Sequence, residues 1–192
     1  MRANARSSAV ILLAVAVAGC AAPLPAAGSR PATDGQQAPA REAEVASIML
    51  RDVHPLYGGQ ILYLAADGSG YCQLLSHRDG VAALYEKRYL LPPSPQLRER
   101  LAGVLTAPAI ASLVSSSGAA LPDTARPALS LQLASGRNVT VQRWQYDKEP
   151  AFEAIYQALI AVAKGAPAQK LLAEGRFDMN WTPPGFEQGK KN

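Results

Sequence analysis

The side chains of this chain that could bind a metal or transfer a proton are few and scattered. The two histidines, His54 and His77, have no second histidine or cysteine at the spacing that brings ligands onto one ion. Four acids stand where turns or helix caps are expected: Asp67, Asp79, Asp123 and Asp147. A short carboxylate accepts hydrogen bonds from backbone amides at such places. We therefore expect exposed loop histidines, capping acids and no metal site.

Nucleophilic chemistry has no sequence support either. A catalytic serine would be expected in Gly-x-Ser-x-Gly or Ser-x-x-Lys, because a nearby base must activate its hydroxyl. Neither string occurs, and residues 115–118 (Ser-Ser-Ser-Gly) predict a flexible loop. Gly68 and Gly70 make too short a glycine run to bind phosphate. We expect no catalytic residue and no cofactor, so the chain is predicted not to be an enzyme.

The two cysteines, Cys20 and Cys72, are too few for a disulfide framework or a structural zinc site. Cys72 falls in an expected strand, on the side predicted to face the core, which favours an inert buried thiol. The alternative is a mixed disulfide with a partner, which would require an exposed thiol.

Cys20 ends a segment with the three parts of a bacterial export signal. Arg2 and Arg6 make its beginning positive, and residues 10–18 form an apolar run that is shorter than the ~20 residues needed to cross a bilayer. The run ends in Val17-Ala18-Gly19-Cys20. This segment resembles the lipobox signal of bacterial lipoproteins over its whole length. The resemblance implies cleavage between Gly19 and Cys20, lipidation of Cys20 and an acylated amino terminus.

An ordinary secretory signal with an incidental cysteine is the alternative, although such a signal would favour an Ala-x-Ala cleavage site. In Gram-negative lipoproteins an aspartate after the lipidated cysteine favours retention in the inner membrane. Ala21 stands at that position. The resemblance therefore implies an outer-membrane anchor at Cys20, with the chain facing the periplasm.

Charge and composition exclude two classes of protein. Nineteen basic and 15 acidic residues give a net charge of +4, and removal of the signal with Arg2 and Arg6 leaves 17 against 15. A mature chain so close to neutral lacks the basic stripe that nucleic-acid binding requires. An apolar content of 48% excludes a wholly disordered chain.

The sequence divides the chain into four parts. Residues 1–19 are the signal peptide, and residues 20–45 are the lipidated cysteine with a tether rich in proline and alanine, in which no apolar periodicity supports a fold. Residues 46–165 are expected to form a single α+β domain, and residues 166–192 a C-terminal tail. About 120 residues suffice to bury ~65% of the surface of an unfolded chain, so the domain should fold alone.

Short apolar segments separated by Asp-Gly turns predict an antiparallel meander over residues 61–66, 71–75 and 81–89. The pairing parity divides its side chains between two faces. The uncharged face, predicted to lie on the core, consists of Ile61, Tyr63, Cys72, Leu74, Val81, Ala83 and Tyr85. The other face, half apolar and expected to be partly covered, consists of Leu62, Leu64, Tyr71, Gln73, Leu84, Glu86 and Arg88.

Two main helices and a second hairpin follow. Ser94-Pro95 predicts a capped helix, with a short second helix after Pro108. Alternating residues over 129–133 and 139–141 predict a hairpin with a three-residue loop. Asp147 is expected to cap a last helix with an apolar stripe from Phe152 to Ala163. The order βββα(α)ββα indicates a two-layer α+β fold, in which an antiparallel sheet of meander plus hairpin is covered by two main helices.

Three large aromatic residues are candidates for partner binding. Trp144 and Tyr146 are predicted to lie on the face opposite Val139 and Val141, unless a bulge near Arg143 turns them inward. Aromatic side chains on an outer sheet face favour a binding surface, although cover by the tail or a helix is the alternative. Trp181 lies in the tail, which either packs back on the domain or offers an extended segment to a partner.

The function predicted from these features is that of a non-catalytic, outer-membrane-anchored domain that binds or supports another envelope component. The layout over residues 55–165 resembles small bacterial envelope-lipoprotein domains of uncharacterised activity. Two alternatives stay open: a periplasmic inhibitor or immunity lipoprotein that covers the cleft of a toxic enzyme, and an envelope hydrolase with a scattered site. Apart from the membrane, reached through the lipid at Cys20, the partner is an unknown protein or envelope component.

We predict that Cys20→Ala abolishes lipid labelling and membrane retention, because the thiol is the attachment point that the signal implies. Metabolic labelling with a radioactive fatty acid and membrane fractionation measure both effects. Label uptake that persists in the variant contradicts the assignment.

Overall fold

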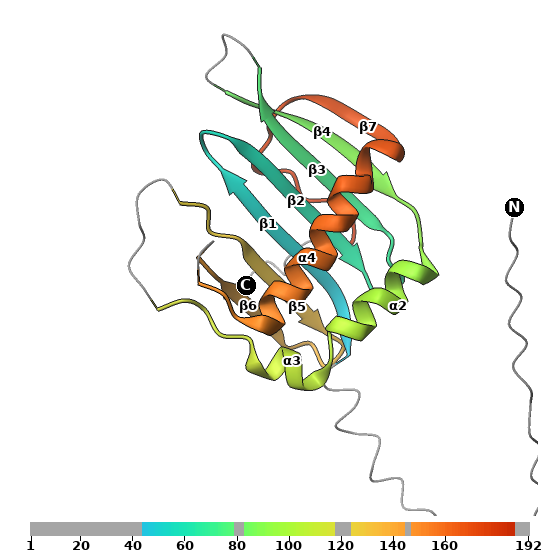
Figure 1. Cartoon of the computed structure of the whole chain (residues 1–192). Helices are drawn as coiled ribbons and strands as arrows, with labels where there is room; N and C mark the ends of the chain where they lie inside the picture. The colour runs from blue at the N-terminus through green and yellow to red at the C-terminus, as the bar shows by residue number, and fades with distance from the viewer. Residues whose placement is uncertain (1–43, 79–82, 118–123, 145–146, 187–192) are drawn as a thin grey trace, which may run out of the picture. The chain divides into compact units, whose positions relative to one another are not determined.

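The computed structural model describes residues 44–78, 83–117, 124–144 and 147–186, all within one compact unit. They form one seven-stranded antiparallel sheet and three α-helices (Figure 1). The strands are β1 (Val45–His54), β2 (Gly58–Ala65), β3 (Gly70–His77), β4 (Leu84–Leu91), β5 (Ala128–Leu133), β6 (Asn138–Gln142) and β7 (Lys170–Arg176). The helices are α2 (Pro95–Val104), α3 (Ala107–Ser112) and α4 (Pro150–Gly165), and a 3-10 turn (Ala166–Ala168) follows α4.

The α+β class is confirmed, but the predicted order of elements is wrong. The sequence does not predict β1, which precedes the meander, or β7, which follows the last helix. The observed order is ββββααββαβ, and the strands lie in the sheet as β6-β5-β1-β2-β3-β4-β7. Because β7 pairs with β4, the fold continues beyond residue 165 into the segment expected to be a tail.

The strand β1 joins the hairpin β5–β6 to the meander. It pairs with β2 on one side and with β5 on the other. Ile48 and Leu50 are buried in the core on the helix side, whereas Met49 and Val53 pack on the opposite face. Apolar side chains thus point both ways, and β1 lacks the apolar–polar alternation that marks a half-buried strand in a sequence.

The turn between β2 and β3 corrects one face assignment. The amide of Ala65 donates to the carbonyl of Ser69 at 2.8 Å, which leaves three residues in the loop instead of the two of a tight Asp-Gly turn. Gly68 provides the positive φ of 80° that this loop requires. The additional residue shifts the pairing by one, so that Leu62 lies opposite Cys72. A shift of one residue exchanges the faces of a strand.

The predicted face is therefore wrong for β2 and agrees with the observed register for β3 and β4. Leu62 and Leu64 join Cys72 in the core on the helix side. Ile61 and Tyr63 lie on the opposite face, with Tyr71, Gln73, Glu86 and Arg88.

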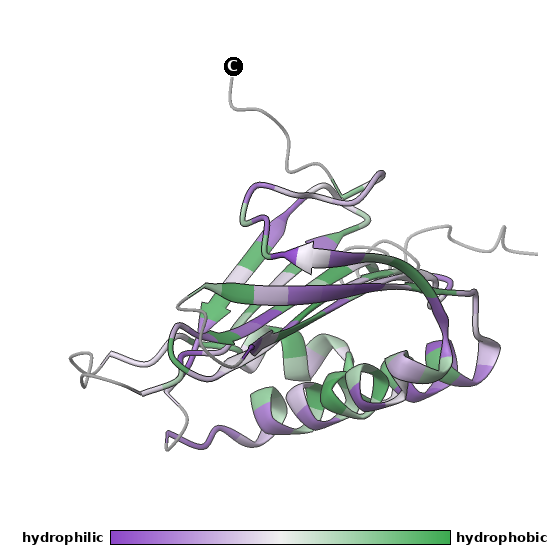
Figure 2. Cartoon of the chain, turned by 90° about the horizontal axis from the view of Figure 1, so that it is seen from above, coloured by the Kyte–Doolittle hydropathy of each residue, from purple (hydrophilic) through white to green (hydrophobic). Residues whose placement is uncertain are grey.

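The helices lie on one side of the sheet (Figure 2), and their apolar side chains share a core with it. Ile155 and Leu159 of α4 and Leu101 of α2 are buried in this core. On the opposite face a second cluster is formed by Ile61, Tyr63 and Leu75 with the tail residues Phe177, Trp181 and Phe186. Of the two possibilities predicted for the tail, the structure therefore shows the one in which it packs back on the domain.

The helices α2 and α4 begin at polar residues whose side chains cap their first amides. Ser94 caps α2 as predicted, since its Oγ accepts a hydrogen bond from the amide of Leu97 at 3.2 Å. The predicted cap of α4 is wrong: the carboxylate of Glu149, not Asp147, accepts from the amides of Ala151 and Phe152. Asp147 instead forms an ion pair with Arg143 at 2.8 Å.

The hairpin of β5 and β6 is confirmed. Leu131 lies opposite Val139, and the amide of Leu133 donates to the carbonyl of Arg137 at 2.8 Å, which leaves a three-residue loop. Gly136 takes the positive φ of 83° that such a loop needs.

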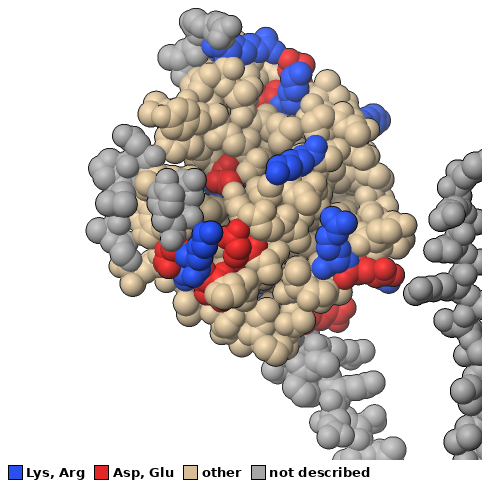
Figure 3. All heavy atoms as spheres, in the orientation of Figure 1, with Lys and Arg blue, Asp and Glu red and all other residues tan. Residues whose placement is uncertain are grey.

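Two further observations describe the surface. None of the helices in the described ranges is long and apolar enough to cross a membrane. On the face shown in Figure 3, acidic and basic side chains are interspersed across a largely uncharged surface.

We predict that Leu131→Ala and Leu159→Ala each lower the free energy of unfolding by about 2–5 kcal/mol, since both lose buried apolar contacts and leave a cavity. Leu131 is 1% exposed and Leu159 is fully buried. Leu172→Ala is the matched control because Leu172 is 43% exposed, and it should change stability by less than ~1 kcal/mol. Chemical denaturation measures all three; wild-type midpoints for the first two variants would show that the core assignment is wrong.

Candidate functional site

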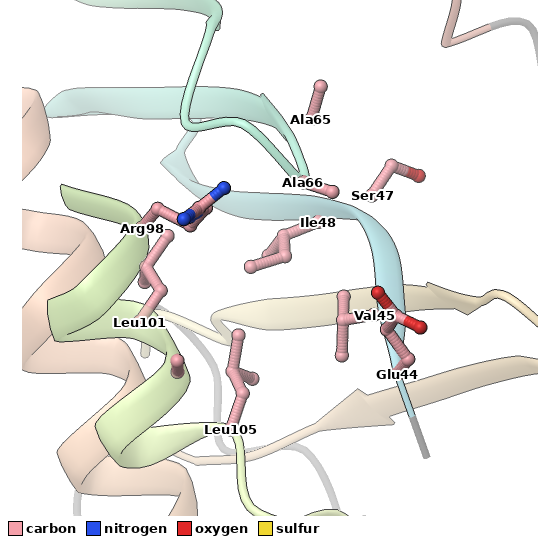
Figure 4. A pocket seen from close by; sticks show the side chains of 10 residues that line it. Glu44, Val45, Ser47, Ile48, Ala65, Ala66, Arg98, Leu101 and Leu105 are labelled. Atoms are coloured by element: carbon pink, nitrogen blue, oxygen red, sulfur yellow. The ribbon is translucent and has the colours of Figure 1, made fainter. Parts of the chain in front are cut away.

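An apolar pocket of about 340 Å³ lies between α2, the start of β1 and the end of β2. Its interior is mainly aliphatic: Val45, Ile48, Ala65, Ala66, Leu101, Ala102 and Leu105. Ser47, Glu44 and Arg98 add a hydroxyl and two opposite charges. Figure 4 shows Arg98 reaching from α2 over Ile48, with Glu44 at the far side of the opening.

The position of α2, and with it one wall of the pocket, depends on the turn between β2 and β3. The amide of Ser94 donates to the carbonyl of Asp67 at 3.2 Å, so the cap of α2 is tied to this turn. Gly68 packs so closely here that a Cβ would lie 3.0 Å from the carbonyl oxygen of Ser94. The carboxylate of Asp67 accepts from the amide and hydroxyl of Ser69, which lowers the pKa of Asp67. A residue larger than glycine at position 68 would displace the helix cap.

The lining of the pocket combines apolar walls with a few polar groups. Pockets of roughly 300–1,000 Å³ with an apolar lining and a few polar groups typically take small ligands. The one hydroxyl of the lining, on Ser47, donates to the amide oxygen of Gln132 at 3.2 Å. Arg98 and Glu44 are exposed and could orient a polar group at the opening.

Trp144 lies two residues beyond the end of β6, half-buried, and not on a sheet face. Its amide donates to Ser116 Oγ at 3.1 Å, and the guanidinium of Arg126 stacks on its ring with Cζ 3.4 Å from the centroid. A hollow of about 130 Å³ adjoins this pair. The tail aromatics pack on β2 and β3, which are three and four positions away from β6 in the sheet. Trp144 is thus neither exposed on an outer face of the sheet nor covered by the tail.

Arg143, beside Trp144, is buried and holds the neighbouring loops together. Its guanidinium donates to the carbonyl of Val114 at 2.8 Å and to the carboxylate of Asp147. Ser115 and Ser116, expected in a flexible loop, bind Gln142 and Trp144 through their hydroxyls. Tyr146, Asp79 and Asp123 lie outside the described residues.

Trp181 packs back onto the domain from the tail. Its ring lies edge-on to Tyr63 and Tyr71, with centroids 6.1 and 5.9 Å apart. Arg88 lies over the same ring at 4.3 Å. Burial raises the pKa of Tyr63, the largest cause of its shift. Of the three predicted binding residues, the structure therefore places Trp144 and Trp181 at separate sites.

The remaining residues that the sequence singled out are Cys72 and the two histidines. Cys72 is fully buried, and this burial raises the pKa of its thiol to about 12. Both histidines lie near the turn between β1 and β2: His54 Nδ1 accepts from the amide of Leu56, and His77 Nε2 lies 3.2 Å from the carbonyl of Pro55. Within the described ranges no group of three His, Cys, Asp or Glu side chains could hold a metal ion.

Sequence reasoning missed the pocket and the face under Trp181. The pocket combines Glu44 with Arg98, which stand more than fifty residues apart and carry no motif. The signal available in the sequence was the spacing of Leu101 and Leu105, four residues apart, which places both on one face of a helix; both line the pocket.

Comparison with family models, with curated proteins and with solved structures finds no match to this chain. The geometry of the domain must therefore support any functional assignment.

We predict that Cys72 in a Cys20→Ala chain resists alkylation by iodoacetamide in the folded state and reacts once the chain is denatured. Burial raises the pKa of this thiol from its ordinary value of 9.0 to about 12. This raised pKa stabilises the fold fully below about pH 9, and the contribution is lost as the pH rises toward 12. Mass spectrometry measures the alkylation.

A Cys72→Ala, Ser76→Cys variant is the matched control, because Ser76 is exposed on the same strand and its thiol should react in the folded state. Alkylation of folded Cys72 at the rate of the denatured chain would contradict its burial.

Proposed function

We propose that this chain is a non-catalytic lipoprotein, anchored to the outer membrane through Cys20, whose domain binds a small amphipathic molecule in the pocket between α2 and β1. The observation that carries the proposal is the aliphatic lining of this pocket with Arg98 at its opening. Apolar walls favour a hydrocarbon portion, because its burial removes apolar surface from water. The guanidinium favours an anionic head group.

The place of the pocket in the chain supports an amphipathic ligand. Glu44 and Val45 line the pocket and are the last two residues of the segment 20–45 that was expected to be the tether. A flexible chain of this length spans on the order of 25 Å. The pocket would therefore remain near the membrane surface, where amphipathic molecules concentrate.

We predict that dodecanoate binds the wild-type chain and that Ala102→Trp weakens this binding at least tenfold. Ala102 lines the pocket and is exposed, so a large ring at this position fills the pocket without disturbing the core. Glu99→Trp on the same helix is the matched control, because Glu99 is exposed and outside the pocket lining. Isothermal titration calorimetry measures the affinities.

Arg98→Gln tests the head group. It should weaken dodecanoate but not neutral dodecanol, which lacks the charge that the guanidinium binds. Equal dodecanoate affinity in wild-type, Ala102→Trp and Glu99→Trp chains would contradict the proposed site.

A further inference from the structure

The second feature of interest is the outer face of the sheet, defined here as Tyr63, Tyr71, Gln73, Glu86 and Arg88. Residues 177–186, here called the strap, lie across this face. The strap follows β7 and contains no helix or strand. It is on the side of the sheet opposite the helices, and it shares no residue with the pocket between α2 and β1.

Aromatic side chains of the strap pack directly against aromatic side chains of the outer face. Trp181 and Phe186 each pack edge-on against Tyr63 and Tyr71, with ring centroids 5.7–6.4 Å apart. Arg88 adds a cation–π contact to Trp181. A few aromatic anchors and an arginine are the composition of the energetically dominant part of a protein–protein interface.

The backbone of the strap contributes little to this contact. Phe177 donates its amide to the carbonyl of Leu84, and Asp178 donates to Glu86 Oε1 at 3.4 Å. The later backbone bonds that the described strap makes are internal: Trp181 to Asp178 and Phe186 to Pro183. Beyond Asp178 the side chains of the strap, and not its backbone, hold it on the outer face, as in a bound peptide.

The outer face also carries a polar network that packing alone does not require. Gln73 is 1% and Glu86 4% exposed, and Gln73 Nε2 donates to Glu86 Oε2 at 2.6 Å. Arg88 forms an ion pair with Glu86. Among the described residues, Gln73 Oε1 and Arg88 Nε are buried without a hydrogen-bond partner, although buried polar atoms are nearly always paired.

We propose that the outer face is a peptide-binding surface that the strap occupies within the same chain. The partner is an extended segment with a tryptophan and, three residues before it, an acidic residue, as Asp178 stands before Trp181. Charge complementarity supports this choice, since Arg88 faces Asp178. The segment of the partner would displace the strap and take its place on Tyr63 and Tyr71.

A partner can displace the strap because the strap leaves polar groups of the outer face without full hydrogen bonding. The carboxylate of Asp178 is 53% exposed and its oxygen lies 4.0 Å from the Arg88 nitrogen, too long for a hydrogen bond. A segment that brings its acid closer and reaches Gln73 Oε1 with a donor would bind more tightly.

Displacement of the strap can be followed in the full chain by ¹⁹F NMR, because Trp144 and Trp181 are its two tryptophans. The chain is labelled with 5-fluorotryptophan, and Trp144→Phe assigns the two resonances. The probe is an unlabelled peptide with the sequence of residues 177–186. We expect it to shift the resonance of Trp181 while that of Trp144 stays unchanged. The same peptide with alanine in place of tryptophan should shift neither.

A weakened strap gives a second readout. The fluorescein-labelled peptide should bind the full chain with Trp181→Ala at least tenfold more tightly than the wild type, measured by fluorescence anisotropy. Trp144→Ala is the matched control and should match the wild type. Trp181→Phe, which keeps an aromatic ring on the face, should give an intermediate affinity.

Three results would overturn the proposal. The first is an unchanged Trp181 resonance at saturating peptide, and the second is an equal shift with the alanine peptide. The third is a Trp181 resonance that depends on protein concentration without peptide, which would assign the outer face to the strap of a second copy.

Discussion

The domain depends on the pairing of β1 with β5, a strand that is distant in the sequence. The strand β5 begins more than seventy residues after β1 ends, so their ladder must overcome a large loss of chain entropy. Without β1, the sheet would separate into the hairpin β5–β6 and the four strands β2, β3, β4 and β7. The core on the helix side is continuous because Ile48 lies between Leu131 and Leu64, and Leu50 lies between Leu129 and Leu62.

This central strand also explains why the two proposed binding regions lie on opposite sides of one sheet. Ile48 forms part of the pocket beside α2, whereas Met49 packs in the cluster that the strap covers. Both faces of the sheet are apolar near β1 and β2, and each needs a cover. The helices cover one face of the sheet and leave only local hollows. The cover of the other face depends on three aromatic side chains of the strap, which is an irregular segment. Such cover is easier to exchange for a partner.

The sequence predicts the elements that carry local signals and misses those that depend on distant partners. The cap at Ser94, the apolar stripe of α4 and the hairpin β5–β6 each depend on residues that are close together in the sequence. The segment Lys-Leu-Leu-Ala-Glu-Gly-Arg of β7 has helix-favouring residues and becomes a strand through its pairing with β4. One additional loop residue at Gly68 reverses the faces of β2. The pocket and the outer face combine residues from separate elements, so no local sequence motif predicts them.

The direction of β1 has a mechanical consequence for a chain anchored at its amino terminus. With the lipid anchor proposed at Cys20, a pull from the membrane would reach the domain at the start of β1 and act along this strand. The hydrogen bonds of an antiparallel ladder run perpendicular to the strands, and β1 has such a ladder on both edges. The load therefore shears both ladders at once and does not open them one bond at a time. Under the proposed anchoring, the strand that joins the two parts of the sheet would also be the one best placed to resist strain between the membrane and a bound partner.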